Sequence, residues 1–175
     1  MPLFYDGMDS PLGPLWFAVS DGLSADGGVA LAWVRWGMSE TAFRREVAQR
    51  SDLAPKRDPD RLRGWRRQIA DYFAGRRIDF DGSIAPEGGT PFQRQVWEQI
   101  RTIPYGRVRS YAEIARSMGL PGAARAVGAA CGKNPVPIVV PCHRVVRQDG
   151  SLGGYTGGLH IKKTLLRIEG IDIQD

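Results

Sequence analysis

Cys142, His143 and Arg144 follow one another in the chain, and together they could support thiol chemistry. The reactive form of a cysteine is the thiolate, and nearby histidine and arginine side chains can lower the pKa of a thiol. This triplet therefore points to Cys142 as a nucleophile. The competing interpretation is a structural core cysteine, because a free cysteine often behaves as a small hydrophobe.

The residues before Cys142 predict how the thiol is positioned. Ile138–Val140 is an aliphatic run, and Pro141 fixes its own φ and removes a backbone donor. We therefore expect a buried strand that ends at Pro141 and holds the thiol rigidly at its end. That setting favours the nucleophile over the structural cysteine.

Composition and charge narrow the class of protein. The 175 residues are 42% hydrophobic and 25% charged, as in an ordinary globular protein. Residues 1–84 hold 12 Lys/Arg and 12 Asp/Glu, whereas residues 85–175 hold 12 Lys/Arg and 7 Asp/Glu, so the second half carries the whole net charge of +5. This favours a polyanionic partner for the half that contains Cys142, although a merely basic surface is the alternative.

The cysteine and histidine counts argue against metal and disulfide scaffolds. The chain has two cysteines and two histidines, without a standard zinc spacing, so we expect no metal and no cofactor. Free thiols suit a reducing compartment, and we expect a cytoplasmic protein. No apolar stretch approaches membrane-spanning length and no secretory signal is evident, so we expect no membrane partner.

A Gly- and Pro-containing stretch, residues 82–90, reads as a linker between two domains. Residues 2–36 predict short strands with a turn at Asp26–Gly28, and helices are predicted to begin at Ser39 and at Asp58. We predict a fold of the α/β (α+β) class. Residues 1–85 form a small N-terminal α/β domain with a short antiparallel sheet, and residues 90–175 form a mostly helical domain.

The second domain carries a helix-turn-helix pattern. Capping boxes at Thr90–Gln93 and Ser110–Glu113 predict two helix starts, and a third helix is expected over Ala123–Gly132. That third helix consists almost entirely of small residues, apart from Arg125. Packing against a neighbouring helix explains one small face. A nearly bare helix also suits the narrow minor groove of DNA, where Arg125 could fill the gap left by a flipped base.

Five blocks in this order resemble the methylated-DNA–protein-cysteine methyltransferases, also called O6-alkylguanine-DNA alkyltransferases. The blocks are Pro141–Arg144 with its apolar lead-in, Ser110–Tyr111 with Glu113–Ala115, Ala123–Gly128, Asn134–Pro135 and Gly154–Gly158. The resemblance is close over residues 90–170. It implies a ribonuclease H-like N-terminal domain and a winged helix-turn-helix C-terminal domain.

The resemblance implies a single-turnover transfer of an alkyl group to Cys142 from O6 of guanine, or less readily from O4 of thymine. In the family, the equivalent of His143 takes the thiol proton through a water, and that of Glu169 orients and charges the histidine. Asn134 braces the turn that bears the cysteine, and Tyr111 donates a proton to the departing guanine. Taken alone, Glu169 would read as an exposed acid at a helix end.

The resemblance also implies a DNA surface and a base pocket. Arg125 is the finger that replaces the flipped nucleotide, and the base enters the pocket from the minor-groove side. The other expected DNA contacts are Ala123, Ala124, Ala126, Ser110 and Arg144. The expected pocket residues are Val145, Tyr155, Thr156, Pro137 and Gly157. The implied partner is double-stranded DNA containing O6-alkylguanine, bound by a protein that is monomeric in solution and could be cooperative on DNA.

Several residues depart from the pattern or fall outside it. Gly153 stands where many members have a polar residue, commonly threonine. Lys162 and Lys163 are expected to be solvated or to face phosphate, and Cys131 is expected to be structural. Two rival functions remain: a non-catalytic winged-helix protein that binds alkylated DNA, and a Cys–His thiol hydrolase. The hydrolase leaves the alanine-rich helix and Arg125 unexplained.

Overall fold

The computed structural model describes residues 1–22, 28–49, 54–76 and 79–173. The chain divides into two compact units, Met1–Glu87 and Gly88–Asp175. The turn predicted at Asp26–Gly28 lies, except for Gly28, outside the described residues.

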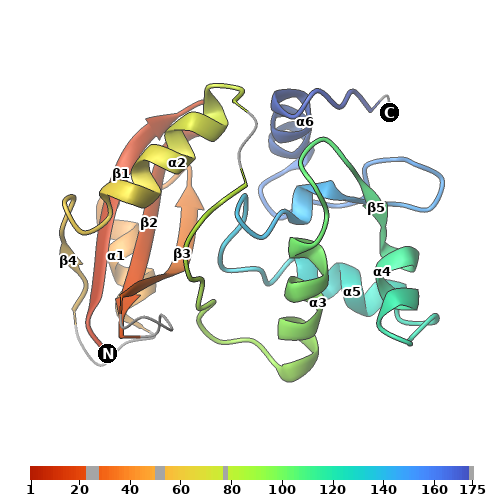
Figure 1. The fold of residues 1–175 in the computed structure, drawn as a ribbon, viewed down its shortest axis with the longest axis horizontal. Helices are drawn as coiled ribbons and strands as arrows, with labels where there is room; N and C mark the ends of the chain where they lie inside the picture. Colours follow the sequence, from red (N-terminus) through yellow and green to blue (C-terminus); the bar gives the residue numbers. More distant parts are fainter. Residues whose placement is uncertain (23–27, 50–53, 77–78, 174–175) are drawn as a thin grey trace. The chain divides into compact units, whose positions relative to one another are not determined.

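The first unit is built on a four-stranded sheet, in the order β3-β2-β1-β4 (Figure 1). The strands are β1 (Leu3–Ser10), β2 (Gly13–Asp21), β3 (Val29–Trp36) and β4 (Lys56–Arg57). The first three are antiparallel, as predicted, but β4 pairs with β1 in parallel, so the sheet is mixed. Strand β4 was not predicted, because its two residues, Lys56 and Arg57, are basic and exposed. The residues that favour strands are those whose side chains pack on a half-buried sheet surface.

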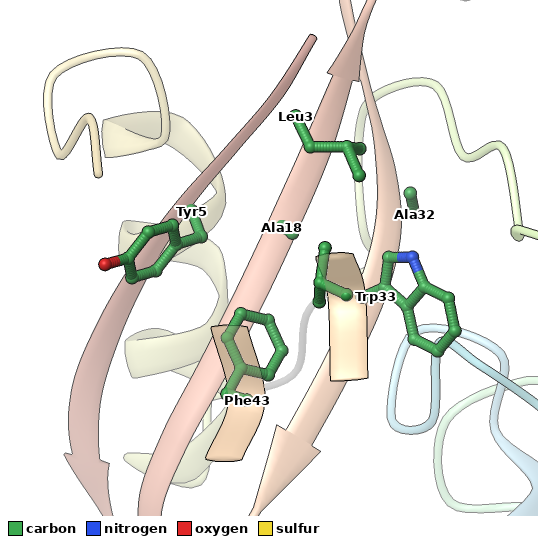
Figure 2. Close-up of a cluster of buried hydrophobic side chains, with 7 residues drawn as sticks. Leu3, Tyr5, Ala18, Ala32, Trp33 and Phe43 are labelled. Atoms are coloured by element: carbon green, nitrogen blue, oxygen red, sulfur yellow. The ribbon is translucent and has the colours of Figure 1, made fainter. Parts of the chain in front are cut away.

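Two helices cover opposite faces of this sheet (Figure 1). Helix α1 (Glu40–Ala48) begins at the predicted cap, where Ser39 Oγ accepts from the Ala42 amide at 3.2 Å. Its buried Phe43 packs with Leu3, Tyr5, Ala18 and Trp33 on one face of the sheet (Figure 2).

The other helix, α2 (Arg63–Phe73), begins five residues after the predicted Asp58. Asp58 instead closes a preceding turn, where its carboxylate accepts from the Arg61 amide at 3.0 Å. The predicted stop is confirmed, since Gly75 follows the helix with a φ of 73° that favours glycine.

The second unit is mostly helical. Its helices are α3 (Pro91–Arg101), α4 (Tyr111–Ser117), α5 (Ala124–Cys131) and α6 (Leu159–Ile168), with a 3₁₀ turn η1 (Cys142–Arg144) and a short parallel pair, β5 (Arg109–Ser110) and β6 (Val145–Val146). Both capping boxes are present as predicted, at Thr90 and Ser110. The predicted helix-turn-helix is the pair α4–α5. Helix α5 is also bonded to α3, because Trp97 Nε1 donates to the Ala130 carbonyl at 2.9 Å.

The segment before Cys142 is a compact turn, and the prediction of a strand there is wrong. Ile138 has a φ of 78°, which reverses the chain, and the Val140 amide donates to the Val136 carbonyl at 2.9 Å. A β-branched residue in the left-handed region is an outlier that costs on the order of 1–3 kcal/mol and persists only where its surroundings over-determine it.

Among the described residues, no helix is long and apolar enough to cross a membrane.

Candidate active site

Asn134 fixes the turn that delivers Cys142. Its Nδ2 donates to the Val140 carbonyl at 2.8 Å and to Cys142 Sγ at 3.3 Å, while its Oδ1 accepts from the Val136 amide at 2.9 Å. One amide side chain therefore holds both ends of the strained turn and the sulfur. These bonds explain how the conformation of Ile138 is maintained.

The thiol of Cys142 is buried, with 6% of the residue exposed. Burial raises the pKa of Cys142, opposed by hydrogen bonds from Asn134 and Tyr155 and by the charge of Lys162. Arg144, which its position in the sequence suggested as a partner of the thiol, instead donates to Glu169. The free thiol therefore keeps its proton at neutral pH, and a nucleophilic role requires a base.

His143, the residue next to Cys142, is the expected base. Its Nε2 lies 2.6 Å from Glu169 Oε1, and both side chains are 0% exposed. Burial lowers the pKa of His143, whereas the hydrogen bond and charge of Glu169 raise it. With the lower pKa, the imidazole is neutral at pH 7. In that state Nε2–H donates to Glu169, and Nδ1 is the nitrogen that can accept a proton.

Glu169 is held by more donors than His143 alone. Arg144 donates from Nε to Oε2 at 2.9 Å and from its NH2 nitrogen to Oε1 at 3.1 Å, and the Gly106 amide donates to Oε2 at 3.2 Å. Burial alone would raise the pKa of Glu169, but the hydrogen bond of His143, with its charge when it is protonated, and the hydrogen bonds and charge of Arg144 lower it to about 2. The carboxylate is therefore ionised at neutral pH.

Tyr111 lies between α5 and the glycine-containing loop. Its hydroxyl donates to the Gly154 carbonyl at 3.4 Å. Burial, with the nearby thiols, raises the pKa of Tyr111 to about 12, so the phenol keeps its proton. A Cβ at Gly153 would stand 3.0 Å from the Tyr111 ring and hydroxyl, and Gly153 has a φ of 69°. The glycine at this position therefore allows the observed placement of Tyr111.

Lys162 is buried, at 0% exposure, and the expectation that it is solvated is wrong. Its Nζ donates to the carbonyl of Val145 at 2.6 Å and to that of Leu152. Burial lowers the pKa of Lys162 to about 8. The ammonium ties the strand after the cysteine to the start of the glycine-containing loop, so it connects two walls of the expected base pocket.

Comparison with known proteins decides the family of this site. Residues 91–171 match the family described as 6-O-methylguanine DNA methyltransferase, DNA binding domain. A methylated-DNA–protein-cysteine methyltransferase of Shigella flexneri is 41% identical to this chain, in an alignment that covers 96% of this chain and 96% of that protein. The chain belongs to the methylated-DNA–protein-cysteine methyltransferase family.

Other members agree with this assignment. The methyltransferase of Mycobacterium bovis is 43% identical over 95% of this chain and 92% of its own length. The crystal structure of the Mycobacterium tuberculosis O6-methylguanine methyltransferase superposes with a TM-score of 0.77 at 40% identity, covering 95% of this chain and 92% of that one. The chain is thus an O6-methylguanine DNA methyltransferase that repairs alkylated DNA.

The helix expected to meet DNA presents small residues to solvent in this methyltransferase. Arg125, Ala126 and Ala129 are exposed, Ala123 and Ala124 are half-buried, and Val127 and Ala130 face the core. The near absence of side-chain bulk is therefore a property of the exposed face. Packing against α3 and α4 accounts only for the buried one.

Two members of the expected DNA-contacting set are placed elsewhere. Ser110 is 6% exposed, and its hydroxyl accepts from the Glu113 amide at 3.1 Å as a helix cap. Arg144 is also 6% exposed and binds Glu169. Both side chains satisfy neighbouring groups inside the fold, so we withdraw them from the DNA surface.

The expected pocket residues fall into two groups. Val145 and Pro137 are buried, whereas Tyr155 and Gly157 are half-buried and Thr156 is exposed, in the loop after Leu152. Thr156 Oγ1 donates to the Gly132 carbonyl at 3.3 Å, which ties this loop to the end of α5. Among the described residues, no group of three or more His, Cys, Asp or Glu side chains could hold a metal.

Sequence reasoning missed Lys162 and Gly106 as parts of the site. Lys162 carried a readable signal, because it shares a helical face with Leu166 and Glu169 at spacings of four and seven residues. The amide of Gly106 carried none, since a backbone donor has no residue-type signature.

Proposed function

We propose that Cys142 accepts the alkyl group of O6-alkylguanine, and less readily of O4-alkylthymine, in a single-turnover reaction. The thiolate sulfur attacks the alkyl carbon. As the S–C bond forms, the C–O6 bond breaks and its electron pair returns to the base. The thioether is stable, so each protein molecule reacts once. The observation that supports this proposal most directly is the sulfur held by Asn134 beside the buried His143–Glu169 pair.

The proton balance assigns roles to two further side chains. The thiol proton passes to His143 through a water, and Glu169 stabilises the imidazolium that results. Tyr111, whose hydroxyl keeps its proton at neutral pH, donates that proton to the guanine that leaves. Transfer of a proton through water from the imidazolium to the tyrosinate then restores both side chains, so the net products are the thioether and guanine. Val145, Tyr155, Thr156, Pro137 and Gly157 line the pocket that receives the base.

Helix α5 is the element that we propose binds DNA. The target base lies inside the duplex, so it must be extruded before the sulfur can reach it. The exposed small residues of α5 fit the minor groove, and Arg125 takes the place of the extruded nucleotide. A crystal structure of the Mycobacterium tuberculosis relative is described as a complex with DNA, with a TM-score of 0.76 to this chain. We propose the same partner here, bound by a protein that is monomeric in solution and works in the reducing cytoplasm.

Intact-protein mass after incubation with a duplex containing one O6-methylguanine tests the transfer. We expect a gain of about 14 Da, one methylene, with one methyl group per protein molecule. The Cys142→Ala variant should bind the duplex and show no gain. An unmodified wild-type protein that still binds the duplex would support the non-catalytic DNA binder instead. Turnover of an ester or amide without a mass gain would support the thiol hydrolase.

Replacing Arg125 by alanine should slow transfer from a duplex by about tenfold or more, because extruding a base costs a few kcal/mol and each 1.4 kcal/mol is a factor of ten. The matched control is Arg116→Ala, which removes an exposed arginine from α4. Single-turnover rates on duplex and single-stranded O6-methylguanine oligonucleotides separate the effects. A finger for the flipped base predicts a loss on the duplex alone, and equal losses on both substrates would contradict it.

A further inference from the structure

Arg144 is a buried cation whose contacts the proposed reaction does not use. Its side chain is 8% exposed, and its two contacts to the Glu169 carboxylate form a fork, at 2.9 and 3.1 Å. Its NH1 nitrogen donates to the Ile103 carbonyl at 2.6 Å, and the guanidinium lies 5.8 Å from the centre of the Tyr105 ring. Each of the three guanidinium nitrogens therefore donates to a group within the protein.

The fork restricts where Glu169 can place its oxygens. A bidentate guanidinium–carboxylate pair fixes the carboxylate plane, whereas a single hydrogen bond leaves it free to turn. The fixed plane aims Oε1 at His143 Nε2, 2.6 Å away. Glu169 is the C-cap residue of α6, so its backbone alone does not determine the orientation of the carboxylate.

The charge of the guanidinium acts on His143 as well. A buried carboxylate that faced the imidazole without a second cation would favour the imidazolium, and an imidazolium cannot accept the thiol proton. Arg144 stands against the same carboxylate and balances its charge. It also repels a proton on His143, since its charge lowers the pKa of that imidazole.

From this geometry we propose that Arg144 is a positioning residue for alkyl transfer. It fixes the Glu169 carboxylate against His143, and it balances the carboxylate charge so that His143 stays able to take a proton. The inference rests on the proposed role of His143 as the base.

Other charged groups around His143 bear on the same equilibrium. Glu169 at the end of α6 favours the imidazolium, and Lys162 within α6 opposes it. Within η1 itself, the neighbouring residue is Cys142. Helix α3 also packs against η1, and its buried residues carry no charge: Val96, Trp97 and Ile100. Removal of Arg144 leaves Glu169 as the stronger influence, so the pKa of His143 should rise.

The titration of His143 measures this directly. The chain has two histidines, and His160 is exposed, so a His160→Gln background leaves one imidazole signal for NMR. In that background Arg144→Gln should raise the midpoint of the His143 titration by about one pH unit or more. Arg144→Lys, which keeps the charge and loses the fork, should leave the midpoint within about half a unit of the parent.

Single-turnover transfer across pH 5.5–9 gives the second readout, with about tenfold or larger effects expected from misplaced groups. Arg144→Gln should move the acidic limb of the rate profile to higher pH, and Arg144→Lys should lower the plateau without moving that limb. Equal losses at every pH in both variants, with an unchanged His143 midpoint, would show a merely structural arginine and overturn the proposal. If Arg144→Gln does not fold, a wild-type rate in Arg144→Lys overturns it. The NMR titration needs no alkyl transfer, so failure of the proposed reaction is seen separately.

Discussion

Glu169→Gln is expected to destabilise the protein by about 3–5 kcal/mol, because it leaves the charge of Arg144 buried without its counter-ion. The carboxylate accepts from His143, Arg144 and the Gly106 amide, and its side chain is 0% exposed. A neutral amide offers one acceptor oxygen and two N–H donors to a site that holds only donors. The stability loss should come with loss of alkyl transfer, because His143 loses the group that stabilises its protonated form.

Urea unfolding at several pH values measures this effect. The pKa of Glu169 is about 2 in the folded protein against an ordinary value of 4.5. The folded state therefore binds this proton less readily than the unfolded state. Its contribution is fully present above pH 4.5 and is lost as pH falls towards 2. The stability difference between the wild type and Glu169→Gln should shrink by about 1.4 kcal/mol for each pH unit in that window.

The control for this experiment is Glu98→Gln, which removes an exposed carboxylate from α3. We expect a change within about 0.5 kcal/mol at every pH. A Glu169→Gln protein as stable as the control at pH 7 would mean that Arg144 is not an uncompensated charge when the carboxylate is gone. That result would also weaken the proposed positioning role of Arg144.

The parts of the site that local sequence could predict are those that local physics determines. The capping boxes at Thr90 and Ser110 are satisfied within three residues, so their sequence signature is complete. The same holds for the small-residue composition of α5, which is visible without a partner. The start of α2 was misplaced because Asp58 can cap either a turn or a helix, and only packing against the sheet decides between them.

The parts that could not be predicted depend on contacts between distant residues. Arg144 follows Cys142 by two positions in the sequence, which suggested that Arg144 is a partner for the thiol or for DNA. Its actual partner, Glu169, is 25 positions away. The aliphatic run of residues 138–140 resembles a strand, since nothing in it shows that Asn134 will hold it as a turn with Ile138 at a φ of 78°. In the first case the long side chain of Arg144 overrides the local pattern, and in the second the side-chain amide of Asn134 does so.

Lys162→Met is expected to remove a pH dependence of stability that a solvated lysine would not produce. The pKa of Lys162 is lowered from 10.5 to about 8 by burial. Between these values the unfolded chain holds the proton and the folded protein has released it. Stability therefore rises with pH wherever the unfolded state binds more protons, here from pH 8 to 10.5. The rise attributable to this group is on the order of 3 kcal/mol, at about 1.4 kcal/mol per pH unit.

The variant has a second consequence, in the base pocket. Methionine fills a similar volume but cannot donate to the carbonyls of Val145 and Leu152, which then lose a buried partner. The two pocket walls should move apart, and a displacement near 1 Å can cost about 100-fold in rate. We therefore expect alkyl transfer by Lys162→Met to fall by about tenfold or more at pH 7, with Lys163→Met as the control on the half-buried neighbouring position.

Urea unfolding of both proteins from pH 7 to 10.5 separates these effects. The titrations of Cys131, Cys142 and Tyr111 act in both proteins, so the difference between the two stability curves reports Lys162. A difference that grows in favour of the wild type above pH 8 supports a buried ammonium that loses its proton within the fold. A flat difference would place the ammonium in contact with water. In that case the two carbonyl contacts would orient the loop without a desolvated charge, and the slower alkyl transfer would have to arise from geometry alone.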